Sequence, residues 1–407
     1  MVSSTIDHLV SVTVFLAATL LFIGLFNQTI QTAVVYQQHR AIATKCSDLL
    51  DNMLLNPGAP TDWGQRSAAP TGFGLQDPEF TEYKLNPFSL MRLCSYTGTP
   101  VYYEKTNMTY SNITMGFGNY LLMPYSDVLS YSTALKLLGI DNKYGFQLTL
   151  TPVVTVTVTE TSARSPLSFS VDVEGTGFPL AYARVSYYLF LVSLSGGGAY
   201  PSYTVRSGVT ETNEQGIASV PFADVTDASL CYTFIAYAHL GGLSGVGYTE
   251  RNSADNNYIV PFVGNASERT VLIAHSWDVH EFGPPVAELK YNATFVIFTE
   301  DFSLREVPLD NATGSINYGE GYPYGEVTLP DDNSGILIAA YRKSANEGGV
   351  VMTPWGLSSM GFSISFGGDS SKQEWVATDM RQVLVNGIAY QAKLALWSLE
   401  GYQVIAQ

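Results

Sequence analysis

The chain has 407 residues, of which 46% are hydrophobic and only 14% are charged, and its formal net charge is −16 with 20 Lys and Arg residues. This length suffices for two or three domains, and the hydrophobic content excludes a chain that is disordered throughout. The acidic balance argues against a nucleic-acid partner, because proteins that bind nucleic acids gather Lys and Arg against the phosphates.

The first predicted element is a helix over residues 1–55, and its beginning is strongly apolar. Residues 9–26 carry no charged side chain, and Ser and Thr are their only polar ones. A helical run of this length crosses the hydrocarbon core of a bilayer. Leaving it in water would cost tens of kcal/mol, at roughly 1.5–3 kcal/mol for each large side chain. The segment is therefore predicted to lie in lipid or among other helices.

The same helix is expected to continue as a stem. Apolar residues recur at helical spacing on one side from Ile30 to Leu54, until Pro57-Gly58 ends the pattern. Fifty helical residues form a rod of roughly 75 Å, whereas a bilayer needs about 20 residues. Roughly half of the rod is thus predicted to project beyond the membrane.

The body after the stem is predicted to be rich in β-strands. Residues 56–145 form an irregular cover segment rich in Pro and Gly, with a short helix near 131–138. Residues 146–257 and 258–407 are expected to form two Ig-like β domains, in which 147–160 alternates as one strand and Asn386-Gly387 marks a hairpin. The predicted fold class is α+β: a long N-terminal apolar helix followed by a mostly antiparallel β headpiece of two β-sandwich-like domains.

Two parts of the chain resemble known families. The first fifty residues resemble type IV pilins and their archaeal relatives in their apolar first segment, their single early acid at Asp7, the lack of proline before Pro57 and a stem that passes into a β headpiece. Residues 209–218 look like the strand-turn-strand of bacterial-type Ig-like surface domains. In pilins the apolar helix leaves the membrane and packs into the core of a helical filament.

The resemblance implies a structural subunit of an extracellular filament, not an enzyme and without cofactors. Its partners would be copies of itself, the membrane before assembly, the pilus assembly machinery and surface glycans. Asp7 would set the register, with a solvated helix-start acid as the alternative. The other assembly residues would be Leu9, Val12, Phe15, Leu16, Leu20, Phe22, Ile23 and Phe26. The alternative function is a single-pass, membrane-anchored Ig-like surface or envelope protein that forms no filaments.

The remaining motifs are weaker. Cys94 and Cys231 are candidates for one disulfide if the compartment is oxidising. The runs 255–257, 275–281 and 331–335 combine acids with His, Asn or Ser, but they fit neither an EF-hand nor H-E-x-x-H, so no metal site is predicted. Asn-X-Ser/Thr sequons in the body predict five candidate glycosylation sites: Asn107, Asn112, Asn265, Asn292 and Asn311.

Overall fold

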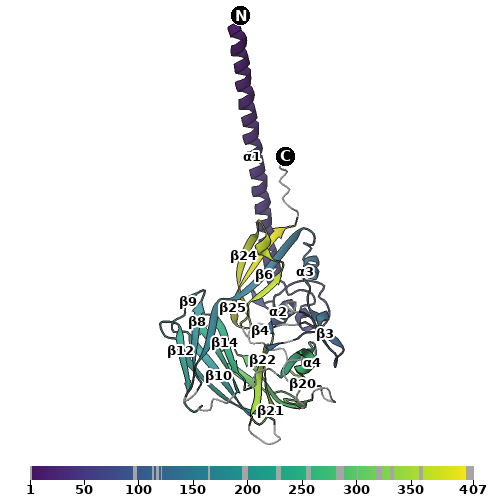
Figure 1. The fold of residues 1–407 in the computed structure, drawn as a ribbon, viewed down its shortest axis with the longest axis vertical. Coiled ribbons are helices and arrows are strands. Elements are labelled where there is room, and N and C mark those ends of the chain that lie inside the picture. Colours follow the sequence, from purple (N-terminus) through teal and green to yellow (C-terminus); the bar gives the residue numbers. More distant parts are fainter. Residues whose placement is uncertain are drawn as a thin grey trace.

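In the computed structural model, the chain forms one long helix that projects from a β-rich head (Figure 1). The structure describes residues 2–94, 99–111, 114–115, 119–120, 122–163, 166–194, 200–225, 231–253, 258–280, 288–299, 301–317, 323–330, 334–356 and 361–399. The predicted fold class is confirmed: an apolar N-terminal helix precedes a mostly antiparallel β region with sandwich-like domains.

The stem is a single helix, α1 (Val2–Leu54), of 53 residues. At 1.5 Å per residue it is roughly 80 Å long, and its N-terminus lies at the end far from the head (Figure 1). The chain turns away just after it, where the Asn56 side-chain oxygen accepts the Gly58 N–H at 2.9 Å. Gly58 has φ +84°, and a Cβ there would lie 2.7 Å from the Trp63 Nε1, so this turn requires glycine.

The cover segment contains only short elements, among them the predicted helix near 131–138. A buried arginine, Arg92, holds part of it together by donating to the backbone carbonyls of Trp63, Arg66, Ala68 and Asp127. The elements are η1 (Trp63–Gln65), β1 (Lys84–Leu85), α2 (Pro87–Cys94), β2 (Val101–Tyr103), β3 (Met108–Tyr110), β4 (Thr114–Met115), β5 (Asn119–Tyr120), η2 (Tyr125–Asp127) and α3 (Tyr131–Leu137).

The first sandwich packs a three-stranded sheet, in the order β12-β8-β7, against a four-stranded sheet, in the order β11-β10-β13-β14. Aromatic side chains join the two inner faces, and the Phe169 and Phe234 rings stack with their centroids 4.3 Å apart. The strands are β7 (Val154–Ser162), β8 (Leu167–Gly175), β9 (Phe178–Pro179), β10 (Arg184–Ser193), β11 (Ser202–Glu211), β12 (Ile217–Phe222), β13 (Cys231–Leu240) and β14 (Leu243–Arg251).

The second β unit pairs a three-stranded sheet, in the order β15-β16-β20, with a sheet in the order β18-β17-β21-β22, to which β19 adds beside β17. Tyr103 and Tyr110 of the cover segment pack against Phe262 of the smaller sheet. The elements are β15 (Ile259–Asn265), β16 (Thr270–His275), α4 (Trp277–His280), β17 (Leu289–Phe298), β18 (Leu304–Val307), β19 (Thr313–Ile316), β20 (Tyr324–Thr328), β21 (Gly335–Ser344) and β22 (Glu347–Trp355).

A further sheet, in the order β1-β24-β25-β6-β23, lies where the stem enters the head (Figure 1). Its central hairpin is the one predicted at Asn386-Gly387, where both residues have positive φ, of 51° and 77°. Its remaining elements are β6 (Tyr144–Pro152), β23 (Ile364–Gly367), η4 (Ser370–Lys372), β24 (Ala377–Val385) and β25 (Ile388–Ser398).

This stem sheet differs from the sequence prediction in two respects. The run 147–160 is not one strand: it divides at Val153 into β6, which pairs with β25 and β23, and β7, which pairs with β8. The sheet also combines β6 from the first predicted β range with β24 and β25 from the second, so it crosses the boundary expected at 257/258. Alternation fixes which face of a strand is buried, but it does not say which sheet the strand joins.

Candidate assembly helix and its joint with the head

The predicted assembly residues are exposed along the free part of α1. Their exposed fractions run from 45% for Val12 to 70% for Phe15, and Leu9, Leu16, Leu20, Phe22, Ile23 and Phe26 lie between these values. Asp7 is exposed as well, less than one turn before Leu9. This helix is long and apolar enough to cross a membrane, and none of its most apolar window is buried by the head.

The hydroxyl groups in the apolar part are satisfied within the helix. Thr13, Thr19 and Thr29 each donate to the backbone carbonyl four residues earlier at 2.8 Å. A hydroxyl bonded in this way needs no water, so it is compatible with lipid or with a neighbouring helix. The segment is therefore apolar in composition, and its few hydroxyl groups leave no unmet hydrogen-bond donor on its surface.

The neck, defined here as residues 27–38, continues the exposed surface toward the head. It carries no Asp, Glu, Lys or Arg, and Ile30, Val34 and Tyr36 are 46%, 47% and 68% exposed. Residues 6–38 together form about 50 Å of exposed helix, whereas the hydrocarbon core of a bilayer is about 30 Å thick. One bilayer cannot cover the whole of this surface.

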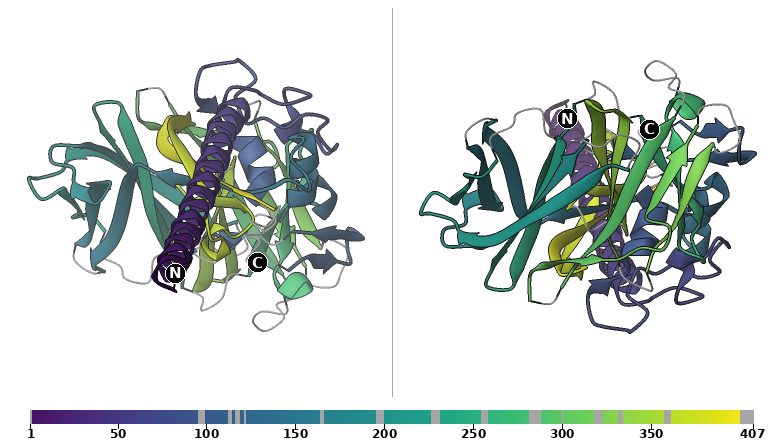
Figure 2. Two further views of the ribbon diagram at one scale, coloured as in Figure 1. Left: turned by 90° about the horizontal axis from the view of Figure 1, so that it is seen from above. Right: turned by 90° about the horizontal axis from the view of Figure 1, so that it is seen from below.

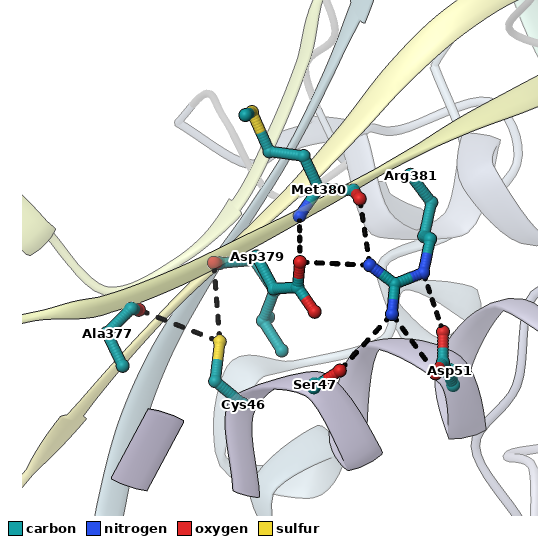
Figure 3. A network of polar contacts seen from close by, with 8 residues as sticks. Cys46, Ser47, Asp51, Ala377, Asp379, Met380 and Arg381 are labelled. Carbon is teal, nitrogen blue, oxygen red and sulfur yellow. Dashed lines mark hydrogen bonds and ion pairs between the residues drawn. The ribbon is translucent and has the colours of Figure 1, made fainter. Parts of the chain in front are cut away.

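The last third of α1 is buried against the stem sheet. Ile42, Cys46, Leu49, Leu50 and Met53 recur every three to four residues and are 6% exposed or less. The Cys46 thiol lies 3.5 Å from the Leu394 carbonyl and 3.6 Å from the Ala377 carbonyl (Figure 3). Burial, reinforced by the nearby Asp379 charge, raises the pKa of this thiol to about 11, so Cys46 acts as a packing residue.

A polar network closes one side of this joint (Figure 3). The Arg381 guanidinium of β24 binds Asp51 of α1 through two nitrogens, Nε–Oδ1 at 3.0 Å and Nη2–Oδ2 at 3.2 Å, and also donates to Ser47 at 3.2 Å. A third contact, at 2.9 Å, joins it to Asp379. Burial opposes ionisation of Asp379, but hydrogen bonds from Ser47, the Met380 N–H and Arg381 outweigh it and lower the pKa of that carboxyl.

An aromatic contact marks the upper rim of the joint. The His39 ring stacks on Trp375, with the ring centroids 3.9 Å apart and the planes 3° from parallel. Trp375 precedes β24, so the rim belongs to the same sheet that holds Cys46 and Asp51. The helix therefore meets the head through apolar, ionic and aromatic contacts spread over four turns, which makes the joint a broad contact instead of a hinge.

Sequence reasoning missed Arg381 and Trp375. Arg381 and Asp51 are 330 residues apart, and a lone Arg in an alternating strand has the pattern of any solvent-facing residue. No local signal in the sequence identifies either residue as part of the joint, because their role depends on which sheet receives the stem.

The candidate glycosylation sites differ in their surroundings. Asn107 and Asn311 are exposed, at turns where their φ is 55° and 60°. The side-chain oxygen of Asn265 accepts the Ser267 and Glu268 N–H groups. Asn292 is half-buried in β17, and its amide donates to the Pro201 carbonyl at 3.0 Å. Asn112 lies outside the described residues. Burial and bonding make Asn292 the least suitable acceptor of the four described sites.

The Cys94–Cys231 disulfide stays a prediction, since the structure describes the side chain of only one of the two cysteines. Cys231 is a free, buried thiol that donates to the Gly348 carbonyl at 3.3 Å, because β13 packs its inner face against β22. The Cys94 side chain lies outside the described part.

The runs that combine acids with His, Asn or Ser are only partly described by the structure. His275 ends β16, fully buried, and accepts the Trp277 N–H at 3.1 Å. Residues 255–257 and 331–333 lie outside the described part. Among the residues that are described, no group of three or more His, Cys, Asp or Glu side chains is placed to hold a metal ion.

Comparisons with known proteins add no functional information. Neither the models of known protein families nor the curated proteins include a match to this chain. Among solved structures, a Salmonella alpha-2-macroglobulin reacted with methylamine aligns over 56% of this chain with 10% identity and a TM-score of 0.21. A red sea bream transglutaminase aligns over 61% with 8% identity and a TM-score of 0.17. The chain spans 17% and 37% of those two proteins, and likeness at this level supports no argument about fold or activity.

Proposed function

We propose that this chain is the repeating structural subunit of an extracellular filament of the type IV pilus kind. The chain polymerises through residues 6–38 of α1, and the β head forms the outer sheath. Its role is structural and not catalytic. Before assembly the apolar segment holds the subunit in the membrane, where the pilus assembly machinery would meet it.

The observation that carries this proposal is the length of the exposed helix. About 50 Å of uncharged helix, from residue 8 to residue 38, projects from the head. The hydrocarbon core of a bilayer covers only about 30 Å, and residues such as Val34 and Tyr36 in the neck stay exposed with the head in place. Parallel helices of other copies would cover the apolar segment and the neck together.

The broad joint supports the same proposal. A membrane anchor works equally well through a flexible linker, because it only has to keep the head near the membrane. A helical polymer repeats one geometry at every subunit, so each head must keep a fixed orientation relative to its helix. Arg381, Cys46 and Trp375 provide that fixed orientation by holding α1 against β24 and β25.

Assembly would exchange lipid contacts for helix–helix contacts. The large side chains from Leu9 to Phe26 would pack against the same segment of neighbouring copies, and Asp7 would fix the axial register by pairing with a cationic group there, since a carboxylate in an apolar core is costly unless paired. Sugars on Asn107 or Asn311 would then lie on the outside of the sheath, where surface contact occurs.

A second candidate function is a single-pass anchored surface protein with Ig-like domains. It is favoured by the match between residues 9–26 and the thickness of one bilayer. In that case the neck would stand free in water as an isolated helix, at the cost of its exposed apolar side chains.

The experiment that separates the two is electron microscopy of material sheared from the surface of expressing cells, with antibodies against the head. Rods composed mainly of this chain are expected. If the chain stays entirely in the membrane fraction as single copies while its head is folded, the filament proposal is wrong and the anchor is preferred.

A further inference from the structure

A cleft of about 560 Å³ opens on the head between the cover segment and the turn that joins β15 to β16. The run 62–68, which carries Arg66, forms one wall, and the turn 266–269, which carries Arg269, forms another. Trp355 borders the cleft but is 2% exposed, so it forms a closed apolar floor. No residue of α1 lines the cleft, and the cleft has no part in the proposed polymerisation.

The wall that carries Arg66 is fixed from behind by the buried Arg92. Its guanidinium donates to the carbonyls of Arg66 at 2.9 Å and Ala68 at 3.2 Å, as well as to that of Trp63. Arg92 is 1% exposed, and burying a guanidinium is costly. The hydrogen bonds that compensate this cost hold residues 63–68 in one conformation, so the cleft wall is preorganised.

The wall that carries Arg269 is held by backbone contacts. Arg269 has φ +58°, a conformation that a residue with a side chain adopts at a cost. Its carbonyl accepts the Leu329 N–H at 2.9 Å, and its Nε lies 3.4 Å from the Leu329 carbonyl. Both arginines therefore stand on fixed backbone on the two sides of one cavity.

The charge of the lining is opposite to that of the whole chain. Two arginines and Asp62, which pairs with Arg66 at 2.7 Å, leave the lining at +1, whereas the whole chain carries −16. Gln65, Ser67 and Ser267 add neutral hydrogen-bonding groups. The lining thus combines guanidinium groups with hydroxyl and amide groups.

We infer that this cleft binds an acidic saccharide, with the sugar carboxylate between Arg66 and Arg269. Guanidinium groups recognise carboxylates through paired N–H donors. Sugar hydroxyls suit the hydroxyl and amide side chains of the lining. The volume favours a saccharide over a single Asp or Glu side chain of another protein, which would leave most of the cavity empty.

The test uses the full-length protein in detergent micelles, titrated calorimetrically with digalacturonate and with its methyl ester. In the ester, a methyl group on each carboxyl removes the negative charge while the sugar rings and hydroxyls stay the same. We expect the acid to bind at least tenfold more tightly than the ester, and Arg66→Gln and Arg269→Gln each to weaken the acid five- to tenfold. Arg305→Gln, an equal charge change on the exposed face of β18, is the matched control and should leave binding unchanged.

Three outcomes would overturn this assignment. Equal affinity for acid and ester would remove the role of the arginines, and full competition by sulfate at equal concentration would indicate an anion site without sugar recognition. If the protein self-associates and Arg66→Gln abolishes this association, the cleft binds a carboxylate of a second copy instead. None of these outcomes affects the filament proposal, which is tested by microscopy alone.

Discussion

The two parts of α1 have the same secondary structure but opposite surroundings. Residues 42–54 bury one side against β24 and β25, whereas the large apolar side chains of residues 6–38 are exposed. The helix projects from the head in Figure 1 and is seen from its two ends in Figure 2. The docked part is polar on its open side and includes Lys45 and Asp48, while Asp7 is the only Asp, Glu, Lys or Arg in the free part. The apolar side of the docked third is therefore covered by the chain's own head. The apolar surface of the free part can be covered only by lipid or by other molecules.

The largest effect is expected from breaking the helix between these two parts. Val34→Pro removes a backbone hydrogen bond and places the ring against the preceding turn, at a cost of about 3 kcal/mol or more. We predict that filaments seen by electron microscopy disappear, while the head keeps its thermal unfolding midpoint and the chain still reaches the membrane. Val34→Ala is the control. Normal filaments from the proline variant would contradict a continuous stem.

Truncating one leucine in each part tests the comparison directly. Leu50→Ala removes a fully buried side chain and should lower the free energy of unfolding by about 2–5 kcal/mol. Leu20→Ala removes one that is 69% exposed and should leave the unfolding of the detergent-solubilised monomer unchanged. The measurement is the thermal unfolding midpoint of each variant in the same detergent. Equal shifts would mean that the free part also packs within its own chain.

A smaller effect is expected at the polar side of the joint. Arg381 and Asp51 are 26% and 39% exposed in their side chains, so their coupling should be about 1 kcal/mol or less. A double-mutant cycle with Arg381→Ala and Asp51→Ala measures this coupling, which should fall as salt is added. Strictly additive effects at low salt would show that the ion pair contributes nothing to the joint.

The smallest effect is the acid dependence of the same joint. The pKa of Asp379 is lowered in the folded protein below its ordinary 3.8, so this carboxylate contributes stability above that value and loses it as the pH falls through the folded pKa. Asp379→Asn should remove this part of the pH dependence below pH 4 and leave the rest unchanged. If the free energy of unfolding of the variant depends on pH below 4 as it does in the unchanged protein, Asp379 does not contribute to the acid dependence.

The sequence predicted the stem more completely than the head. The stem has a strong local signal, namely an uncharged run followed by one-sided helical spacing and then Pro57-Gly58, so its end was placed within one residue of Leu54. The hairpin at Asn386-Gly387 was equally local. The division of 147–160 into β6 and β7 was missed because both halves alternate in the same way. The arrangement of the stem sheet was missed because its strands come from three distant parts of the chain.

For the candidate site the same distinction holds. The sequence alone determined that residues 9–26 must avoid water, because the hydrophobic effect depends on side-chain composition and needs no knowledge of neighbours. Tertiary structure alone decided which sheet receives the stem, that Arg381 meets Asp51 across the joint, and where along α1 the head stops covering it. These features depend on contacts between residues more than 300 positions apart, which local patterns in the chain do not encode.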